Sequence, residues 1–152
     1  MLKKTIKYVD YNGQDREEDF YFDLSEAELI EMDVNEPDGF EGKMKRVMGS
    51  HDGKQIMAMF KDFIRASYGE KSPDGKYFDK SEEISRRFEH TKAYNVLFME
   101  LCTDAKKAAD FVSGVMPFSN DQRKEFDKTV ADMTEKDDTE TKVMPITDNQ
   151  GV

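Results

Sequence analysis

Two histidines and one cysteine are the side chains best suited to catalysis, and none of them stands in a catalytic pattern. His51 lies in a polar loop and His90 at a helix end, but no serine or cysteine nucleophile has a spacing that would pair it with either imidazole. Cys102 sits in an apolar helical pattern without flanking cations, which is typical of a core residue rather than a reactive thiolate. A lone cysteine also excludes an internal disulfide and a cysteine-based zinc site. We therefore expect no enzyme activity, no cofactor and no metal site.

The loop Glu70–Ser81 has a spacing that invites comparison with an EF-hand. If Glu70 is the first ligand position, Gly75 falls at the sixth, where the calcium loop has its glycine. The twelfth position is then Ser81 instead of a bidentate glutamate, and Glu82 comes one residue late. We therefore predict that the segment is a tight turn between two helices.

The composition indicates an acidic protein with a modest core. Of 152 residues, 37% are hydrophobic and 37% charged, and 33 acids against 23 bases give a net charge of −10. No apolar run approaches the ~18 residues of a membrane span, and the first residues lack an apolar signal core. We expect a cytoplasmic protein without a membrane anchor. Its acidity disfavours nucleic acid as a partner, because the phosphate backbone attracts basic chains.

Nearly the whole net charge belongs to residues 15–41. This segment holds twelve acids and one base, Arg16, which sums to −11 and leaves +1 for the rest of the chain. One interpretation is a solvated face that keeps the protein soluble. The other is a docking surface that steers a basic partner and therefore weakens with salt.

The pattern of the chain predicts a β-hairpin followed by helices. Residues 5–11 and 19–24 alternate in polarity around Asn12-Gly13, a strong hairpin signal, with Tyr21 on the outward face and an outer edge left open. Helical spacing is clearest over 54–68, and we predict Gly69 as its left-handed C-terminal cap. Further predicted helices are 26–33 with a Ser25/Glu28 capping box, 40–48, 82–89, one capped by Thr91, one from Thr103 to Val115, and one capped by Ser119.

We therefore predict a mainly α fold with an N-terminal β-hairpin (α+β), built as a small helical bundle plus a C-terminal helix and tail. The composition changes after Pro117, so we divide the chain into a hairpin-plus-bundle domain, 1–117, and an extension, 118–152. The pattern of the extension predicts one helix, followed by a flexible acidic tail. The apolar residues of this helix form a narrow stripe of Phe126, Val130 and Met133.

Ten methionines are many for a chain of this length. Filling of the core is the default explanation. The alternative is an adaptable apolar groove for a partner helix, because thioethers repack at low cost. Met57 and Met59 matter most, since the apolar stripe of helix 54–68 cannot bury both on its own face.

Two sequence blocks occur in order in the centre of the chain. Residues 67–75 read SYG-x-KS-x-DG, and residues 91–101 read T-x-AY-x-x-LF-x-EL. Together, over roughly residues 3–117, they resemble the tail assembly chaperones of long-tailed, non-contractile bacteriophages. The resemblance implies a small, helical, non-enzymatic protein that acts in the host cell cytoplasm and is absent from the mature virion. It also implies the partners, a tape measure protein that is kept soluble and tail tube subunits that are recruited, and it leaves homo-oligomers open.

We hypothesise two partner surfaces. A groove containing Met57 and Met59 would hold the tape measure protein, and the acidic hairpin region would hold another partner through Tyr21, Glu26, Glu28 and Glu31. Three rival classes stay open: a structural minor protein of the tail or head–tail junction, an acidic mimic of nucleic acid, and, least favoured, an enzyme. Apolar residues scattered among the acids argue against the mimic.

The interpretation of Glu70–Ser81 as a turn gives a direct prediction. Addition of millimolar Ca²⁺ leaves the melting temperature unchanged, because the segment lacks the carboxylates of a calcium loop. A thermal scan with and without Ca²⁺, with Mg²⁺ as the control ion, measures this. A rise with Ca²⁺ alone would contradict the interpretation.

Overall fold

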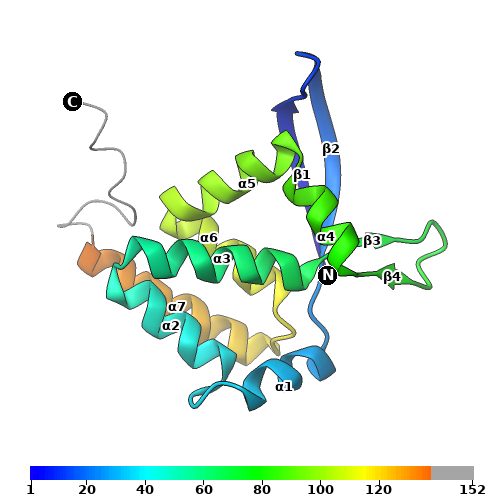
Figure 1. Ribbon diagram of the computed structural model, residues 1–152. Coiled ribbons are helices and arrows are strands. Elements are labelled where there is room, and N and C mark those ends of the chain that lie inside the picture. Colours follow the sequence, from blue (N-terminus) through cyan, green and yellow to red (C-terminus); the bar gives the residue numbers. More distant parts are fainter. Residues whose placement is uncertain (138–152) are drawn as a thin grey trace, which may run out of the picture.

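The computed structural model describes residues 1–137, and these residues form a mainly α fold with an N-terminal hairpin (Figure 1). The predicted fold class is confirmed. The strands are β1 (Leu2–Val9), β2 (Asp15–Phe22), β3 (Tyr68–Lys71) and β4 (Phe78–Asp79). The helices are α1 (Glu26–Val34), α2 (Gly39–Ser50), α3 (Gly53–Ser67), α4 (Glu82–Glu89), α5 (Lys92–Thr103), α6 (Ala105–Val115) and α7 (Asn120–Asp137).

The strands form one antiparallel sheet in the order β1-β2-β3-β4, with β1 at one edge. The predicted hairpin is present, and its turn is held by the Asp10 carboxylate, which accepts the backbone N–H groups of Asn12 and Gln14. Gly13 supplies the positive φ of 78° that the turn requires. Both strands begin earlier than predicted, because polar residues extend the pairing on the exposed face, as in the pair of Lys7 and Glu17.

The prediction that Gly69 is a left-handed helix cap is wrong. Gly69 lies in β3 opposite Tyr21 and is not among the residues with positive φ. A Cβ at this position would come within 2.7 Å of the Phe78 ring and 2.8 Å of the Asp79 carbonyl oxygen. The glycine is needed because β4 approaches β3 closely, and not because the helix ends there.

The helix boundaries follow the predicted capping chemistry with two differences, one at a helix start and one at a helix end. The Ser25/Glu28 capping box is present, and both of its hydrogen bonds are made. In contrast, α6 is capped by Asp104, which accepts the Lys107 N–H, and Thr103 ends α5. The second difference is in α2, which runs through Gly49 and stops only before the left-handed residue His51.

The core is lined by aromatic side chains from the hairpin and the central helices. The Phe111 ring meets two others edge to face. Its centroid lies 5.1 Å from that of Phe22 and 5.9 Å from that of Phe63. Phe126 and Val130 of α7 belong to the same buried cluster, so the core continues past Pro117. The division into 1–117 and 118–152 stays a prediction. The Met133 side chain and the predicted tail lie outside the described residues.

One lysine joins four elements. The Lys80 ammonium donates to the carbonyl oxygens of Asp23 (2.9 Å) and Ala66 (3.0 Å) and pairs with the Glu28 carboxylate at 2.6 Å. We call these four groups the Lys80 clamp. It uses all three ammonium hydrogens and ties the end of β2, the last turn of α3 and the first turn of α1 to the start of α4. A cation at the C-terminal end of α3 is also favoured by the helix dipole.

The clamp predicts that Lys80→Met destabilises the protein although methionine keeps most of the aliphatic stem. Two carbonyl oxygens and one carboxylate lose their partner, which costs about 2–3 kcal/mol. Urea unfolding measures the loss. The control is Lys76→Met, an exposed lysine in the loop between β3 and β4, with an expected change within about 0.5 kcal/mol. Equal stability of the two variants would mean that the clamp contributes little.

Candidate functional site

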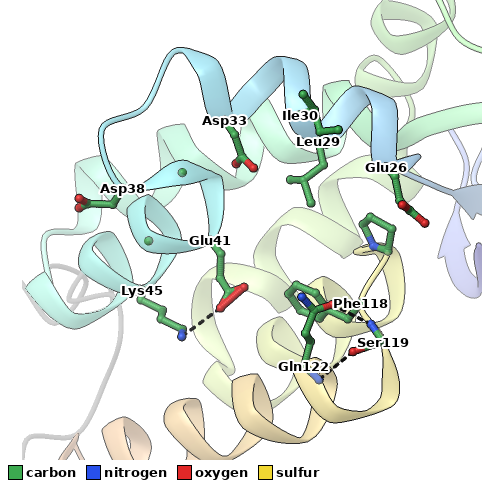
Figure 2. Close-up of a pocket in the computed structure, with 13 residues that line it drawn as sticks. Glu26, Leu29, Ile30, Asp33, Asp38, Glu41, Lys45, Phe118, Ser119 and Gln122 are labelled. Atoms are coloured by element: carbon green, nitrogen blue, oxygen red, sulfur yellow. Dashed lines mark hydrogen bonds and ion pairs between the residues drawn. The ribbon is translucent and has the colours of Figure 1, made fainter.

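An open cleft of about 860 Å³ lies between α1, α2 and the segment that joins α6 to α7 (Figure 2). We call it the α1 cleft. Its apolar part comes from Leu29 and Ile30 on α1 and from Pro117 and Phe118 on the joining segment. Figure 2 shows Leu29 pointing from α1 into the space above Phe118. Phe118 is held from behind by Phe126, with ring centroids 5.4 Å apart.

The rim of the cleft is acidic. Its charged lining residues are one base, Lys45, and four acids, Glu26, Asp33, Asp38 and Glu41, which leaves a net charge of −3. Part of this charge serves the local fold, since Asp33 accepts the Phe40 N–H at 2.6 Å and Glu41 pairs with Lys45 at 3.0 Å. The Glu26 carboxylate has no hydrogen bond or ion pair within the described residues. The rim therefore keeps negative charge that is available to a partner.

The helix α1 is unusual because none of its nine residues is buried. Ile30 and Val34 are 62% and 78% exposed, and Leu29 and Met32 are only partly buried. A helix this short is marginal in water without burial of an apolar face. Besides the partial packing of Leu29 and Met32 on the core, polar contacts hold this helix, namely the capping box, the Lys80 clamp and the Asp33 bond to α2. Apolar side chains are thus held at the surface.

Comparison with known proteins shows the family. A family model described as "Phage tail assembly chaperone" matches residues 1–150. The chain belongs to this chaperone family. The comparisons with curated proteins and with solved structures give no match. The match extends beyond the two central sequence blocks and includes α7. The chaperone therefore acts in phage tail assembly through protein partners, and its family is not an enzymatic one.

The four residues proposed for the acidic partner surface differ in what they contact. In the chaperone, Glu26 lines the α1 cleft, and Glu31 is exposed on the same helix without a side-chain ion pair among the described residues. Glu28 instead belongs to the capping box and the Lys80 clamp. Tyr21 lies on β2, where the Lys71 ammonium stands 5.5 Å from its ring centroid. Glu28 and Tyr21 thus already have partners within the chain, and the role of the four residues in partner binding stays a prediction.

The acids of segment 15–41 differ in the same way. Along β2 its acids face lysines of β1, with Lys3 4.0 Å from Asp19 and Lys7 3.9 Å from Glu17. The hairpin is consequently a mixed-charge surface. The steering interpretation applies to α1 and α2, where the acids surround apolar side chains.

The two methionines proposed for a groove have different environments. Met59 is 4% exposed and belongs to the core, whereas Met57 is partly buried against it. The two side chains therefore do not line one open groove in this structure. A contribution of Met57 to partner binding stays a prediction.

Cys102 and the Glu70–Ser81 loop, which were considered for chemistry, lie in surroundings that serve the fold. Cys102 is buried as predicted, and burial raises the pKa of its thiol to about 11. Asp74 accepts the Lys76 N–H and the Ser72 hydroxyl, and both hydrogen bonds lower the pKa of its carboxyl. The predicted turn is present, but it joins the strands β3 and β4 and not two helices. Within the described part of the chain, no three His, Cys, Asp or Glu residues cluster as a metal site would require. The described helices include none with the length and apolarity to cross a membrane.

Sequence reasoning missed the cleft itself, including Leu29, Ile30, Glu41 and Phe118. The cleft joins α1 and α2 to a segment far along the chain, and no local pattern reports such a contact. One signal was present. Ile30 and Val34 are four residues apart in a helix rich in acids, which places an apolar pair on one helical face.

Glu28 couples the stability of the chaperone to pH. Burial alone would raise the pKa of its carboxyl, but the Lys80 and Ser25 hydrogen bonds and the Lys80 charge outweigh burial and lower the pKa below 4.5. Protons then bind the unfolded chain more readily than the folded one. The stability that Glu28 contributes is complete above pH 4.5 and is lost as the pH falls through the lower folded value.

We predict that Glu28→Gln is less stable than the wild type at neutral pH and that the difference shrinks below pH 4.5. The glutamine amide oxygen retains the capping hydrogen bond from the Ser25 N–H, while the negative charge and the acceptor oxygen that face Lys80 are lost. Urea unfolding across the pH range measures this. Glu31→Gln on the same helix is the matched control, and its difference from the wild type should stay small throughout. A difference for Glu28→Gln that does not vary with pH would contradict the role given to the charge.

Proposed function

We propose that this chaperone binds the tape measure protein of its phage, keeps it soluble and helps to recruit tail tube subunits. It acts in the host cell cytoplasm and is absent from the mature virion. The observation that carries the proposal is the helix α1, which holds Ile30 and Val34 at the surface beside an open, acidic cleft. Uncovered apolar side chains with a charged rim are typical of a surface that binds another polypeptide.

The charge of the chain supports a solubilising role. Each bound copy adds a net charge of −10 to the complex. Like charges on neighbouring copies repel other complexes and oppose aggregation. The solvated-face interpretation of the acidic segment thus contributes to the same function as the docking interpretation.

The sheet edge supports the recruitment of a second partner. β1 is the outer strand of the described sheet, and an edge strand can accept an added strand from another protein. Lys3 and Lys7 lie on its exposed face. Two β1 edges would oppose lysine with lysine, so the edge favours a strand that carries acidic residues over a second copy of itself.

Co-expression with the tape measure protein of the same genome tests the proposal. We expect most of the tape measure protein to move from the pellet to the supernatant and to co-purify with the full-length chaperone. An unrelated acidic protein of similar charge is the control, because charge alone could raise solubility. A tape measure protein that stays insoluble would count against the proposal.

Mass spectrometry of purified phage particles distinguishes a transient chaperone, which we expect to be absent, from a structural component of the virion. Stoichiometric amounts of the chain in the virion would favour a structural minor tail or head–tail protein.

A further inference from the structure

We propose that the α1 cleft takes a basic amphipathic helix, with an apolar ridge seated on α1 and lysine or arginine residues on both flanks. This inference rests on the proposed function, since it names the chemistry of the segment that the chaperone binds. It assigns the cleft residues Glu26, Leu29, Ile30 and Phe118, together with Glu31 and Val34 beside it, as the contact surface.

The spacing of apolar residues on α1 provides a surface for the apolar face of the bound helix. Ile30 and Val34 are one helical turn apart and form an exposed ridge. Leu29, the residue before Ile30, points toward Phe118 across the cleft (Figure 2), and Ile30 also lines the cleft. A helix that packs ridge into groove against α1 would cover the ridge and the cleft at once. The walls of the cleft are helices, whereas the sheet edge that could extend by strand addition lies elsewhere.

The acidic residues on both sides of the ridge favour basic residues on both sides of the bound helix. Glu26 and Asp33 line the cleft on one side of the ridge, and Glu31 follows Ile30 on the other. The carboxylates of Glu26 and Glu31 have no ion pair among the described residues, so a cation from the partner would not displace an existing bond. Complementary charge on both flanks orients a helix and raises its association rate at low salt.

Two occupants from the chain itself fit less well. A second copy docked through the same surface would oppose Glu26, Glu31 and Asp33 with identical acids, because an isologous contact repeats each patch. The C-terminal residues 138–152 carry three acids and one base, which is the same sign as the rim. Charge therefore favours a basic partner over either of them.

A designed peptide tests the inference on the full-length chaperone. The probe is a labelled helical peptide of about 18 residues, with leucines spaced three and four apart and lysines on both flanks. A second peptide keeps the leucines and replaces each lysine with glutamate. We expect the basic peptide to bind more tightly by at least about tenfold and to shift the methyl NMR signals of Leu29, Ile30 and Val34.

Paired variants locate the binding. Glu26→Gln with Glu31→Gln should weaken the basic peptide about three- to tenfold at about 0.02 M salt, and the loss should shrink at about 0.5 M. The charge control is Glu82→Gln with Glu83→Gln, because Glu82 follows the N-cap of α4 as Glu26 follows that of α1. Ile30→Ser with Val34→Ser should cost about tenfold or more. Its control is Val96→Ser with Met99→Ser, two exposed apolar residues of α5.

The outcomes separate this inference from the proposed function. Circular dichroism and thermal unfolding first confirm that each variant is folded. Equal binding of the two peptides, or equal losses in cleft and control variants, overturns the inference. A dimer that light scattering detects and that Ile30→Ser with Val34→Ser abolishes also overturns it.

Co-expression and peptide binding fail independently. If the tape measure protein is solubilised but no basic peptide binds, the inference fails and the proposed function stands. If the peptide binds and the tape measure protein stays insoluble, the proposed function fails instead.

Discussion

The Lys80 ammonium ties α1 to the rest of the fold, where the apolar contacts of this helix are limited to the partly buried Leu29 and Met32. Most helices of this protein are fixed by buried side chains, but α1 buries none of its own. Its first turn is instead held by the pair between Glu28 and Lys80, and the same ammonium binds carbonyl oxygens at the ends of β2 and α3. A mostly buried cation with three partners is directional, because each hydrogen bond has a narrow range of geometry. The clamp therefore adds a directional constraint to the limited apolar packing of α1.

This polar attachment explains how a stable fold can carry uncovered apolar residues. The core lies between the hairpin and the helices α3, α5 and α6, where side chains such as Phe22 and Phe63 are fully buried. The core gains nothing from Ile30 or Val34, so those two positions can serve binding without loss of stability. On this helix Ile30 and Val34 face solvent, whereas Leu29 and Met32 pack partly against the core. The separation of stability from recognition follows directly from the way α1 is attached.

Local chemistry made much of the fold predictable. The capping box at Ser25, the helix 82–89 and the hairpin around Gly13 follow from residues close together in the sequence, and all three are present. The prediction for Gly69 was wrong because the decisive neighbour, Phe78, reaches it only through the tertiary fold. The α1 cleft and the Lys80 clamp were not predicted for the same reason. The acidic segment was correctly counted, yet its charges divide between two surfaces once the chain folds.

The ring of Phe118 belongs both to the floor of the α1 cleft and to the packing of α7, through its contact with Phe126. One aromatic side chain thus serves two surfaces. A ligand that displaced the ring from the cleft floor would also disturb its contact with Phe126, so the C-terminal helix forms the backing of a surface that begins at the amino-terminal helix pair.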